Sequence, residues 1–210
     1  MKKEHKFFER FLDNDLNKLK GFLLKTYDEI QNEQIKGITP LDPKSDNFVD
    51  SQSISTIKWR DYNVFQFYNP EIYNVYTNLS ELIKEACEYY DIDFSKQKFM
   101  VQGWFNVNFT KKGKLDWHDH GPFPAPRFHG YYSINAEPST THYIVHGKNV
   151  DNYNVNNRMI VSEMGHRHAM ADWDWEGPRI TLAYDIVPLS DLIQDDPNNS
   201  LVQQHWIPLI

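Results

Sequence analysis

The chain has 210 residues, a length that suits one domain with a sizeable hydrophobic core. Its formal net charge of −7 argues against binding to the phosphate backbone of a nucleic acid, so we expect no nucleic-acid partner. The sequence shows no signal peptide and no run of about 18 apolar residues, and its single cysteine, Cys87, cannot form an internal disulfide bond, so we expect a cytoplasmic protein with no membrane span.

Two amphipathic helices are predicted in the first half of the chain. Asp13 or Asn14 can cap the first helix, which runs to about Glu33 with apolar residues at three- and four-residue spacing. The second helix has a clearer start, because Asn69 is a good N-cap and Pro70 suits the first helical position. Apolar stripes of this kind predict helices that dock on a sheet.

From Phe99 onward the hydrophobic period changes to two, which is typical of β-strands. Other short segments are rich in β-branched and aromatic residues and are separated by turns that contain glycine or proline. Strands are expected over residues 54–68 (one or two strands), 99–109, 128–135, 141–145, 158–162 and 179–186. An Asn-rich excursion is expected over residues 147–157.

Many short strands with intervening turns predict a mainly β fold with packed helices, a double-stranded β-helix of the jelly-roll or cupin-like kind. We expect a single domain over residues 1–210. Residues 1–98 provide helical N-terminal support, residues 99–188 form the jelly-roll core, and residues 189–210 form a C-terminal tail. The apolar end of this tail can dock on the domain or on a second copy of the chain.

Seven of the nine histidines lie between His118 and His168, and this clustering is the strongest chemical signal in the sequence. Histidine is the commonest metal ligand in proteins. On a strand, residues i and i+2 point to the same face, so His118 and His120 can converge on one ion. His166 and His168 have the same relation on a later strand, so spacing alone does not choose between them.

A candidate anion site follows the last histidines. In the predicted strand that starts at Arg179, the apolar residues Ile180 and Leu182 alternate with Arg179 and Thr181. Arg179 and Thr181 therefore point to the same face. A guanidinium fork with a hydroxyl beside it is well suited to a carboxylate.

These elements together resemble a known family. A His-x-His pair, the strand that carries Gly130-Tyr131-Tyr132, a distal histidine and an Arg-x-Thr motif about ten residues later are similar to the 2-oxoglutarate- and Fe(II)-dependent dioxygenases. Within that superfamily the chain resembles the prolyl-hydroxylase-like branch, and most of all the oxygenases of bacteriophages. The resemblance covers roughly residues 99–188.

The resemblance implies Fe(II) as the metal and 2-oxoglutarate as the co-substrate. It further implies that Arg179 binds the distal carboxylate of 2-oxoglutarate, with Tyr131 or Thr181 donating another hydrogen bond. Substrates of the superfamily include small molecules, amino acids and peptides, and the sequence does not choose among them. A bacteriophage origin would place the protein in the cytoplasm of the host.

The metal-binding motif departs from the family. Its usual ligands are two histidines and one carboxylate, written His-x-Asp…His, whereas here His120 takes the place of the carboxylate. The ligands can be His118, His120 and His168, which strand periodicity favours. Alternatively, Asp119 replaces His120, or Asp116 contributes a carboxylate. The resemblance favours His168 over His166, because its interval to Arg179 fits the family better.

Two other functions stay open at this point. The first is a cupin-like dioxygenase that uses three histidines without 2-oxoglutarate, in which Arg179 binds the substrate itself. The second is a non-catalytic jelly-roll protein whose histidines are structural or bind zinc. Production of succinate and dependence on Fe(II) separate the three possibilities.

Overall fold

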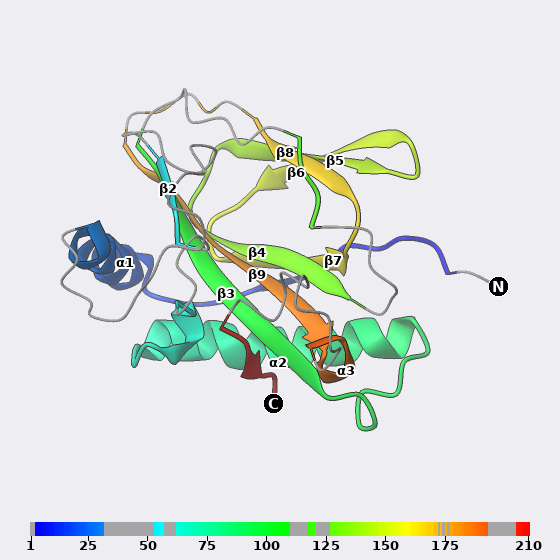
Figure 1. The fold of residues 1–210 in the computed structure, drawn as a ribbon. Coiled ribbons are helices and arrows are strands. Elements are labelled where there is room, and N and C mark those ends of the chain that lie inside the picture. Colours follow the sequence, from blue (N-terminus) through cyan, green and yellow to red (C-terminus); the bar gives the residue numbers. More distant parts are fainter. Residues whose placement is uncertain are drawn as a thin grey trace.

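In the computed structural model of the chain, the described residues are 3–31, 53–56, 62–109, 117–120, 127–171, 173, 175, 177–192 and 205–210. The chain folds into two facing β-sheets, with helices on the outer side of the larger sheet (Figure 1). The strands are β1 (Phe8–Phe11), β2 (Ser53–Ser55), β3 (Phe99–Asn108), β4 (Phe128–Asn135), β5 (Ser139–Val145), β6 (Lys148–Asn154), β7 (Arg158–Glu163), β8 (Arg167–Met170), β9 (Arg179–Pro188) and β10 (Ile207–Pro208). The helices are α1 (Leu16–Gln31), α2 (Pro70–Tyr89), α3 (Leu189–Leu192) and the 3-10 helix η3 (Val64–Gln66).

The two sheets are antiparallel throughout the strand pairs described. The larger sheet has the order β1-β7-β4-β9-β3-β10, and β2 also pairs with β3. The smaller sheet has the order β6-β5-β8. Neighbours in the larger sheet lie far apart in the sequence, as expected for a jelly roll. The predicted fold class, mainly β with packed helices and a double-stranded β-helix, is confirmed.

Helix α2 begins as the sequence predicts. The Asn69 side chain accepts hydrogen bonds from the backbone N–H groups of Glu71 and Ile72, and Pro70 occupies the first turn. One face of the helix is fully buried, and α2 packs against β1 and β7. This face consists of Ile72, Val75, Leu79, Ser80, Leu82, Ile83, Ala86 and Cys87.

Helix α1 is capped one residue after Asn14 and two after Asp13, the two predicted caps. Asp15, not Asp13 or Asn14, accepts hydrogen bonds from the backbone N–H groups of Asn17 and Lys18. Asn14 is buried instead and donates to the hydroxyl of Tyr132 at 3.1 Å. Its polar side chain therefore ties the start of α1 to β4 rather than to the helix itself.

Strands β1, β6 and β10 were not expected from the sequence. The Asn-rich excursion contains β6, an edge strand that pairs only with β5 among the described residues. Its side chains are polar and largely exposed, so it lacks the apolar alternation on which the strand prediction depends. The predicted helical support also supplies β1, which extends the larger sheet beside β7.

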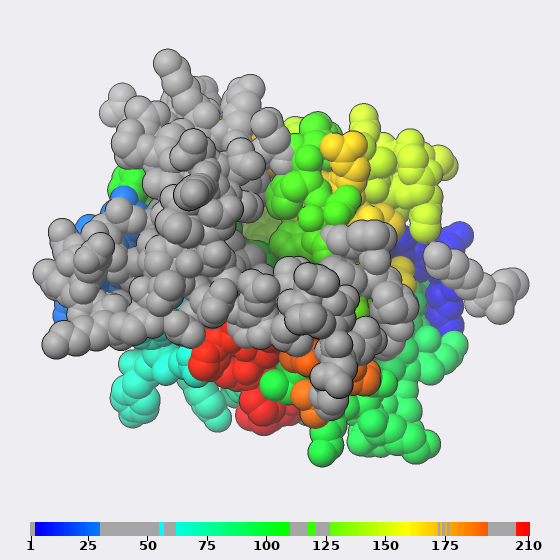
Figure 2. Space-filling view, viewed as in Figure 1, coloured from blue at the N-terminus to red at the C-terminus, as the bar shows by residue number. Residues whose placement is uncertain are grey.

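The C-terminal tail docks on its own domain. Strand β10 pairs with β3, and Leu209 is buried in the main core. Figure 2 shows these last residues (red) on the surface between cyan and orange segments of the chain. Among the described helices, none is long and apolar enough to cross a membrane.

The two faces of the larger sheet have different compositions. On β9, Ile180, Leu182 and Tyr184 belong to the main hydrophobic core beneath the helices. Ala183 belongs to a second, smaller cluster with Trp104 and with residues of the smaller sheet, so the odd-numbered positions face the space between the sheets. The alternation predicted for this strand is confirmed, and it directs Arg179 and Thr181 to the inner face.

Candidate metal centre

His118 and His168 lie directly opposite one another on adjacent chain segments. The residues around His118 pair with β8 through two backbone hydrogen bonds, His118 N–H to His168 O at 3.0 Å and His168 N–H to His118 O at 2.8 Å. Side chains of opposed residues in an antiparallel pair emerge on the same face. The two imidazole rings are accordingly close, with centroids 4.3 Å apart.

His120 joins this pair because it lies two residues beyond His118. Its ring centroid is 5.5 Å from that of His118 and 5.2 Å from that of His168. One nitrogen from each of the three rings can be chosen so that all three lie within 4.8 Å of one another. The structure therefore brings His118 and His120, which strand periodicity places on one face, together with His168, which the resemblance favours over His166.

Two of these histidines have one ring nitrogen already engaged. His120 Nδ1 lies 2.9 Å from a carboxylate oxygen of Asp185, and His168 Nδ1 lies 3.2 Å from the carbonyl oxygen of His166. An Nδ1–H that donates to an oxygen leaves the lone pair on Nε2, the usual state of a metal-binding histidine. His120 Nε2 is buried and has no hydrogen-bond partner among the described residues.

Asp185 and His129 were missed by the sequence reasoning. They are directly opposed residues of β9 and β4, and His129 Nδ1 lies 2.7 Å from the second carboxylate oxygen of Asp185. The carboxylate therefore bridges His120 and His129. Only the register between β4 and β9 brings these residues together, and no local sequence motif encodes that register.

The buried carboxylate sets the charge of the cluster. Burial alone would raise the pKa of Asp185, but the adjacent His120 and His129 hold it well below its usual range. Burial likewise opposes protonation of His120, yet the Asp185 carboxylate, with Asp119, raises the pKa of His120 above its ordinary value.

The pKa values of the other two buried histidines, His129 and His168, are lowered. Burial lowers the pKa of His129 to about 4, and the neighbouring His120 adds to the shift. Burial and the three surrounding histidines hold the pKa of His168 well below its ordinary value. These two rings are therefore neutral at physiological pH, and a neutral imidazole is the form that binds a metal.

The other ligands considered from the sequence do not join the group of His118, His120 and His168. Asp119 is exposed and belongs to neither of the two ligand groups that surround His120. Asp116 lies outside the described residues. His166 belongs to a different ligand group from His168, and its ring packs against His5 with centroids 4.2 Å apart. The second group around His120 consists of His120, His129 and Asp185, two histidines and a carboxylate.

Arg179 is buried on the same inner face of the larger sheet. It is 5% exposed, and its Nε–H donates to Ser139 Oγ at 3.3 Å. Burial lowers the pKa of Arg179 to about 10, with Tyr131 and Tyr143 opposing the shift, so the guanidinium remains charged at neutral pH. Among the described residues, no carboxylate pairs with it.

Further polar side chains are buried on this inner face near Arg179. The hydroxyls of Tyr131 and Tyr143 are buried, and neither meets the geometric criteria for a hydrogen bond to a described residue, although Thr141 and Arg158 lie beside that of Tyr131. Thr181 is also buried on this face, two residues beyond Arg179. Buried polar groups without partners are costly, so this combination fits an anionic ligand with several oxygen acceptors.

Tyr143 connects Arg179 to the histidine cluster. Its ring stacks on that of His168 with centroids 5.4 Å apart, and its hydroxyl is close enough to Arg179 to affect the pKa of the guanidinium. Strands β5 and β8 place Tyr143 and His168 directly opposite one another. The inner face of the two sheets therefore presents candidate metal ligands on one side of Tyr143 and a cationic side chain on the other.

Comparisons with known proteins agree with this architecture. The chain matches no protein-family model, and a search of curated proteins found no significant match. Among solved structures it is similar to a prolyl-4-hydroxylase from Pseudomonas putida, with 9% identity, a TM-score of 0.55, and coverage of 86% of this chain and 91% of that one. It is also similar to SnoN, a non-haem α-ketoglutarate-dependent epimerase of nogalamycin biosynthesis, with 8% identity, a TM-score of 0.55, and coverage of 88% and 78%.

A third similar structure is HygX from Streptomyces hygroscopicus with nickel, 2-oxoglutarate and hygromycin B bound. The identity is 11%, the TM-score is 0.54, and 88% of this chain and 83% of HygX are covered. At these identities the likeness establishes the fold. The chain has the jelly-roll architecture seen in non-haem 2-oxoglutarate-dependent oxygenases.

Proposed function

We propose that the protein is an Fe(II)- and 2-oxoglutarate-dependent dioxygenase whose metal is held by His118, His120 and His168. One observation carries the proposal. Two of the three histidines have Nδ1 tied to an oxygen acceptor, which leaves Nε2 free for an ion shared with the third ring. This donor set lies on the fold of the 2-oxoglutarate-dependent oxygenases described above.

The surroundings of Arg179 are suited to the co-substrate. The guanidinium would bind the distal carboxylate of 2-oxoglutarate bidentately, and the hydroxyl of Tyr131 or Thr181 would donate a further hydrogen bond. The bound iron would supply the activation of dioxygen that oxidatively decarboxylates 2-oxoglutarate and hydroxylates the substrate. The protein's own contribution would be to orient the co-substrate at a buried position.

Asp185 compensates for the missing carboxylate ligand. Three neutral histidines leave the full charge of a divalent ion in the site, whereas the usual triad cancels part of it. Asp185 would not bind the ion itself. Its negative charge lies behind His120, where the carboxylate accepts a hydrogen bond from His120 Nδ1. We propose that it orients His120 and strengthens the imidazole as a donor.

The substrate is proposed only as a class. The similar structures include a prolyl-4-hydroxylase and a protein crystallised with hygromycin B, so both a peptide and a small molecule are consistent with the fold. The likeness to bacteriophage oxygenases and a cytoplasmic location remain predictions from the sequence. So does the absence of a nucleic-acid partner.

The proposed activity is tested by following 2-oxoglutarate and succinate in the presence of Fe(II), ascorbate and oxygen. Because the substrate is unknown, the assay is run with a panel of peptides and small molecules. We expect succinate in stoichiometric amounts with the 2-oxoglutarate consumed, and loss of both when iron is chelated. Iron binding without any consumption of 2-oxoglutarate across a panel of peptides and small molecules would contradict the proposal.

A second candidate is a cupin-like dioxygenase that uses three histidines and no 2-oxoglutarate. The all-histidine group around His118 favours it, because a ligand set without a carboxylate departs from the usual triad of 2-oxoglutarate-dependent enzymes. In that case Arg179 would bind an acidic substrate directly. Iron-dependent oxygen uptake without succinate would identify this activity, and zinc binding without oxygen uptake would indicate a non-catalytic protein.

A further inference from the structure

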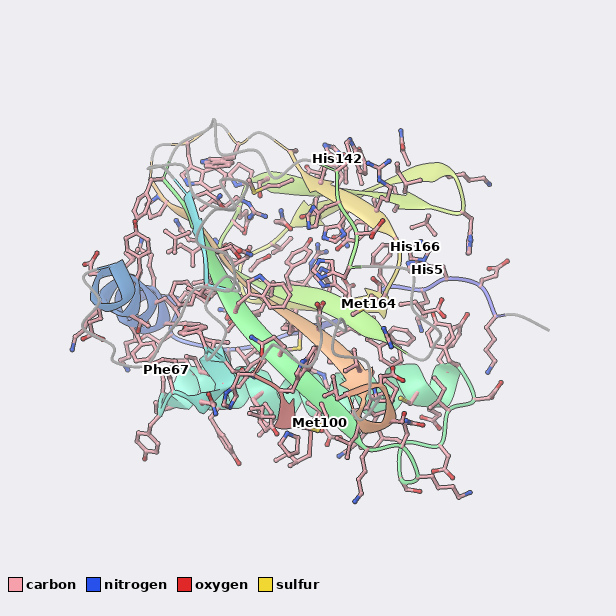
Figure 3. The ribbon with its side chains drawn as sticks, in the orientation of Figure 1. His5, Phe67, Met100, His142, Met164 and His166 are labelled. Atoms are coloured by element: carbon pink, nitrogen blue, oxygen red, sulfur yellow. The ribbon has the colours of Figure 1, made fainter. Side chains whose placement is uncertain are left out.

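A second group of metal-ligand side chains lies away from the candidate centre. It consists of His5, which precedes β1, Glu163 at the end of β7, and His166, which precedes β8. One ligand atom from each can be chosen so that all three lie within 4.8 Å of one another. Figure 3 shows His5 and His166 side by side, with Met164 close by and His142 well apart.

The pairing of β1 with β7 brings this group together. These strands are antiparallel, with Phe8 opposite Val161. Continuing that register beyond the start of β1 carries His5 to the turn that follows Glu163. His166 lies on the other side of the same turn, so three separate backbone positions converge on one point.

His5 has unsatisfied ring nitrogens. Its side chain is 4% exposed, and neither Nδ1 nor Nε2 has a hydrogen-bond partner among the described residues. His5 Nδ1 lies 3.9 Å from Glu163 Oε2, which is too long for a hydrogen bond. A neutral imidazole has one donor and one acceptor, and leaving either group buried and unpaired costs roughly 1–3 kcal/mol.

The distances fit a bridging cation better than direct contact. Two ligands of a tetrahedral zinc ion, each bound at about 2.1 Å, lie about 3.4 Å from each other. The separation of 3.9 Å between His5 and Glu163 is close to that value. Two imidazoles and one carboxylate form a ligand set that suits zinc and similar first-row ions rather than calcium or magnesium.

A phenol lies next to the carboxylate of this group. Tyr90, at the end of α2, lies beside Glu163, and burial together with this carboxylate contributes to a Tyr90 pKa of about 12. The Tyr90 hydroxyl in turn accepts a hydrogen bond from the backbone N–H of Lys6 at 3.2 Å. A protonated phenol next to a ligand carboxylate is the kind of outer support found around metal sites.

We propose that His5, Glu163 and His166 form a second binding site for a divalent first-row transition metal such as Zn(II). The ion joins the segment before β1 to the turn between β7 and β8 and so fastens the edge strand of the larger sheet. This site does not depend on the function proposed above, because it shares no ligand with the His118 group.

The test is metal stoichiometry on the full chain, stripped with chelator and then equilibrated with Zn(II). We expect two equivalents in the wild type, and one equivalent fewer in both His5→Ala and His166→Ala. The matched control is His142→Ala, which removes a partly exposed histidine whose Nδ1 contacts Asp151, and which should keep the wild-type stoichiometry. Circular dichroism checks that each variant is folded.

A second readout tests the position of the ion. Zinc at about 100 times its dissociation constant should make local opening of the N-terminal segment about 100-fold rarer. Tryptic cleavage after Lys6 should therefore slow on addition of Zn(II) in the wild type and in His142→Ala, but not in His5→Ala. Unchanged stoichiometry in both His5→Ala and His166→Ala, or equal zinc protection of Lys6 in His5→Ala, would overturn the proposal. Loss of the other equivalent in His118→Ala leaves it intact, so failure at one site is distinguishable from failure at the other.

Discussion

The two faces of the larger sheet use the same strands for different purposes. The outer face of β9 contributes Leu182 and Tyr184 to the core beneath α1 and α2, and both are fully buried. The inner face of the same strand contributes Arg179, Thr181 and Asp185, which are also nearly fully buried. The side chains on both faces are therefore buried to a similar degree. The two faces differ in the polarity of those side chains.

This difference in polarity indicates that one face of β9 contributes mainly to stability and the other to ligand binding. Apolar burial on the outer face stabilises the fold in proportion to the area removed from water. Buried charges on the inner face lose hydration and are favourable only with a partner or ligand. We therefore expect substitutions on the outer face to lower the free energy of unfolding, and substitutions on the inner face to lower ligand affinity.

The largest effect is expected for His168→Ala. His168 lies between His118 and Tyr143, and its free nitrogen is one of three proposed ligands. The variant should lose measurable Fe(II) binding at the first site, which isothermal titration calorimetry under anaerobic conditions would detect. His129→Ala distinguishes the alternative group, because His129 binds the ion only if the ligands are His120, His129 and Asp185.

Leu182→Ala tests the outer face. The side chain is fully buried in the main core, so its truncation should cost about 2–5 kcal/mol in the free energy of unfolding. Chemical denaturation measures this loss. Iron affinity at a temperature where the variant is folded should be close to that of the wild type, and a large drop in affinity would show that the two faces are not separable.

Asp185→Asn tests the carboxylate behind His120. The substitution preserves the size of the side chain but removes the charge, so metal affinity should fall about 10- to 100-fold. Asp151→Asn is the matched control, because Asp151 contacts His142 in the same way on the exposed hairpin of β5 and β6. Equal affinities in the two variants would show that Asp185 has no role in metal binding.

Arg179→Lys should affect the co-substrate alone. Lysine keeps the positive charge but loses the bidentate fork, so the apparent affinity for 2-oxoglutarate should fall roughly tenfold, with little change in iron binding. The comparison is Arg10→Lys, which alters a partly exposed arginine paired with Glu85 on the outside of the molecule. Unchanged 2-oxoglutarate affinity in both Arg179→Lys and Arg179→Ala would favour the three-histidine, cupin-like activity.

The smallest effect concerns Cys87. Its thiol is buried in the outer core, and burial raises its pKa to about 12, so little thiolate exists at neutral pH. Thiol reagents should therefore modify the folded protein far more slowly than the unfolded protein. Rapid modification of the native protein would show that the helix-covered face opens readily.

Local patterns in the sequence were sufficient for much of the fold. The N-cap at Asn69 and the alternation around Leu182 both depend on neighbouring residues, and both are confirmed. The edge strand β6 was missed because its polar residues carry no hydrophobic period. The cap of α1 was misplaced because Asn14 bonds instead to a residue distant in the sequence.

The sequence predicts the candidate site only where the site residues are close together in the chain. Spacing predicts that His118 and His120 share a face. The contacts of His120 and His129 with Asp185 depend on long-range strand pairing, which local periodicity does not encode. The same reason applies to His5, which meets His166 only because β1 pairs with β7.

The most direct test of the central claim is an anaerobic crystal structure with Mn(II) in place of Fe(II) and with 2-oxoglutarate, in which anomalous scattering locates the ion. We predict an ion bound by His118, His120 and His168, and a distal carboxylate of 2-oxoglutarate on Arg179. An ion held by Asp119, or by His129 and Asp185, would contradict the assignment of the ligands. Binding of 2-oxoglutarate away from Arg179 would contradict the assignment of the co-substrate site.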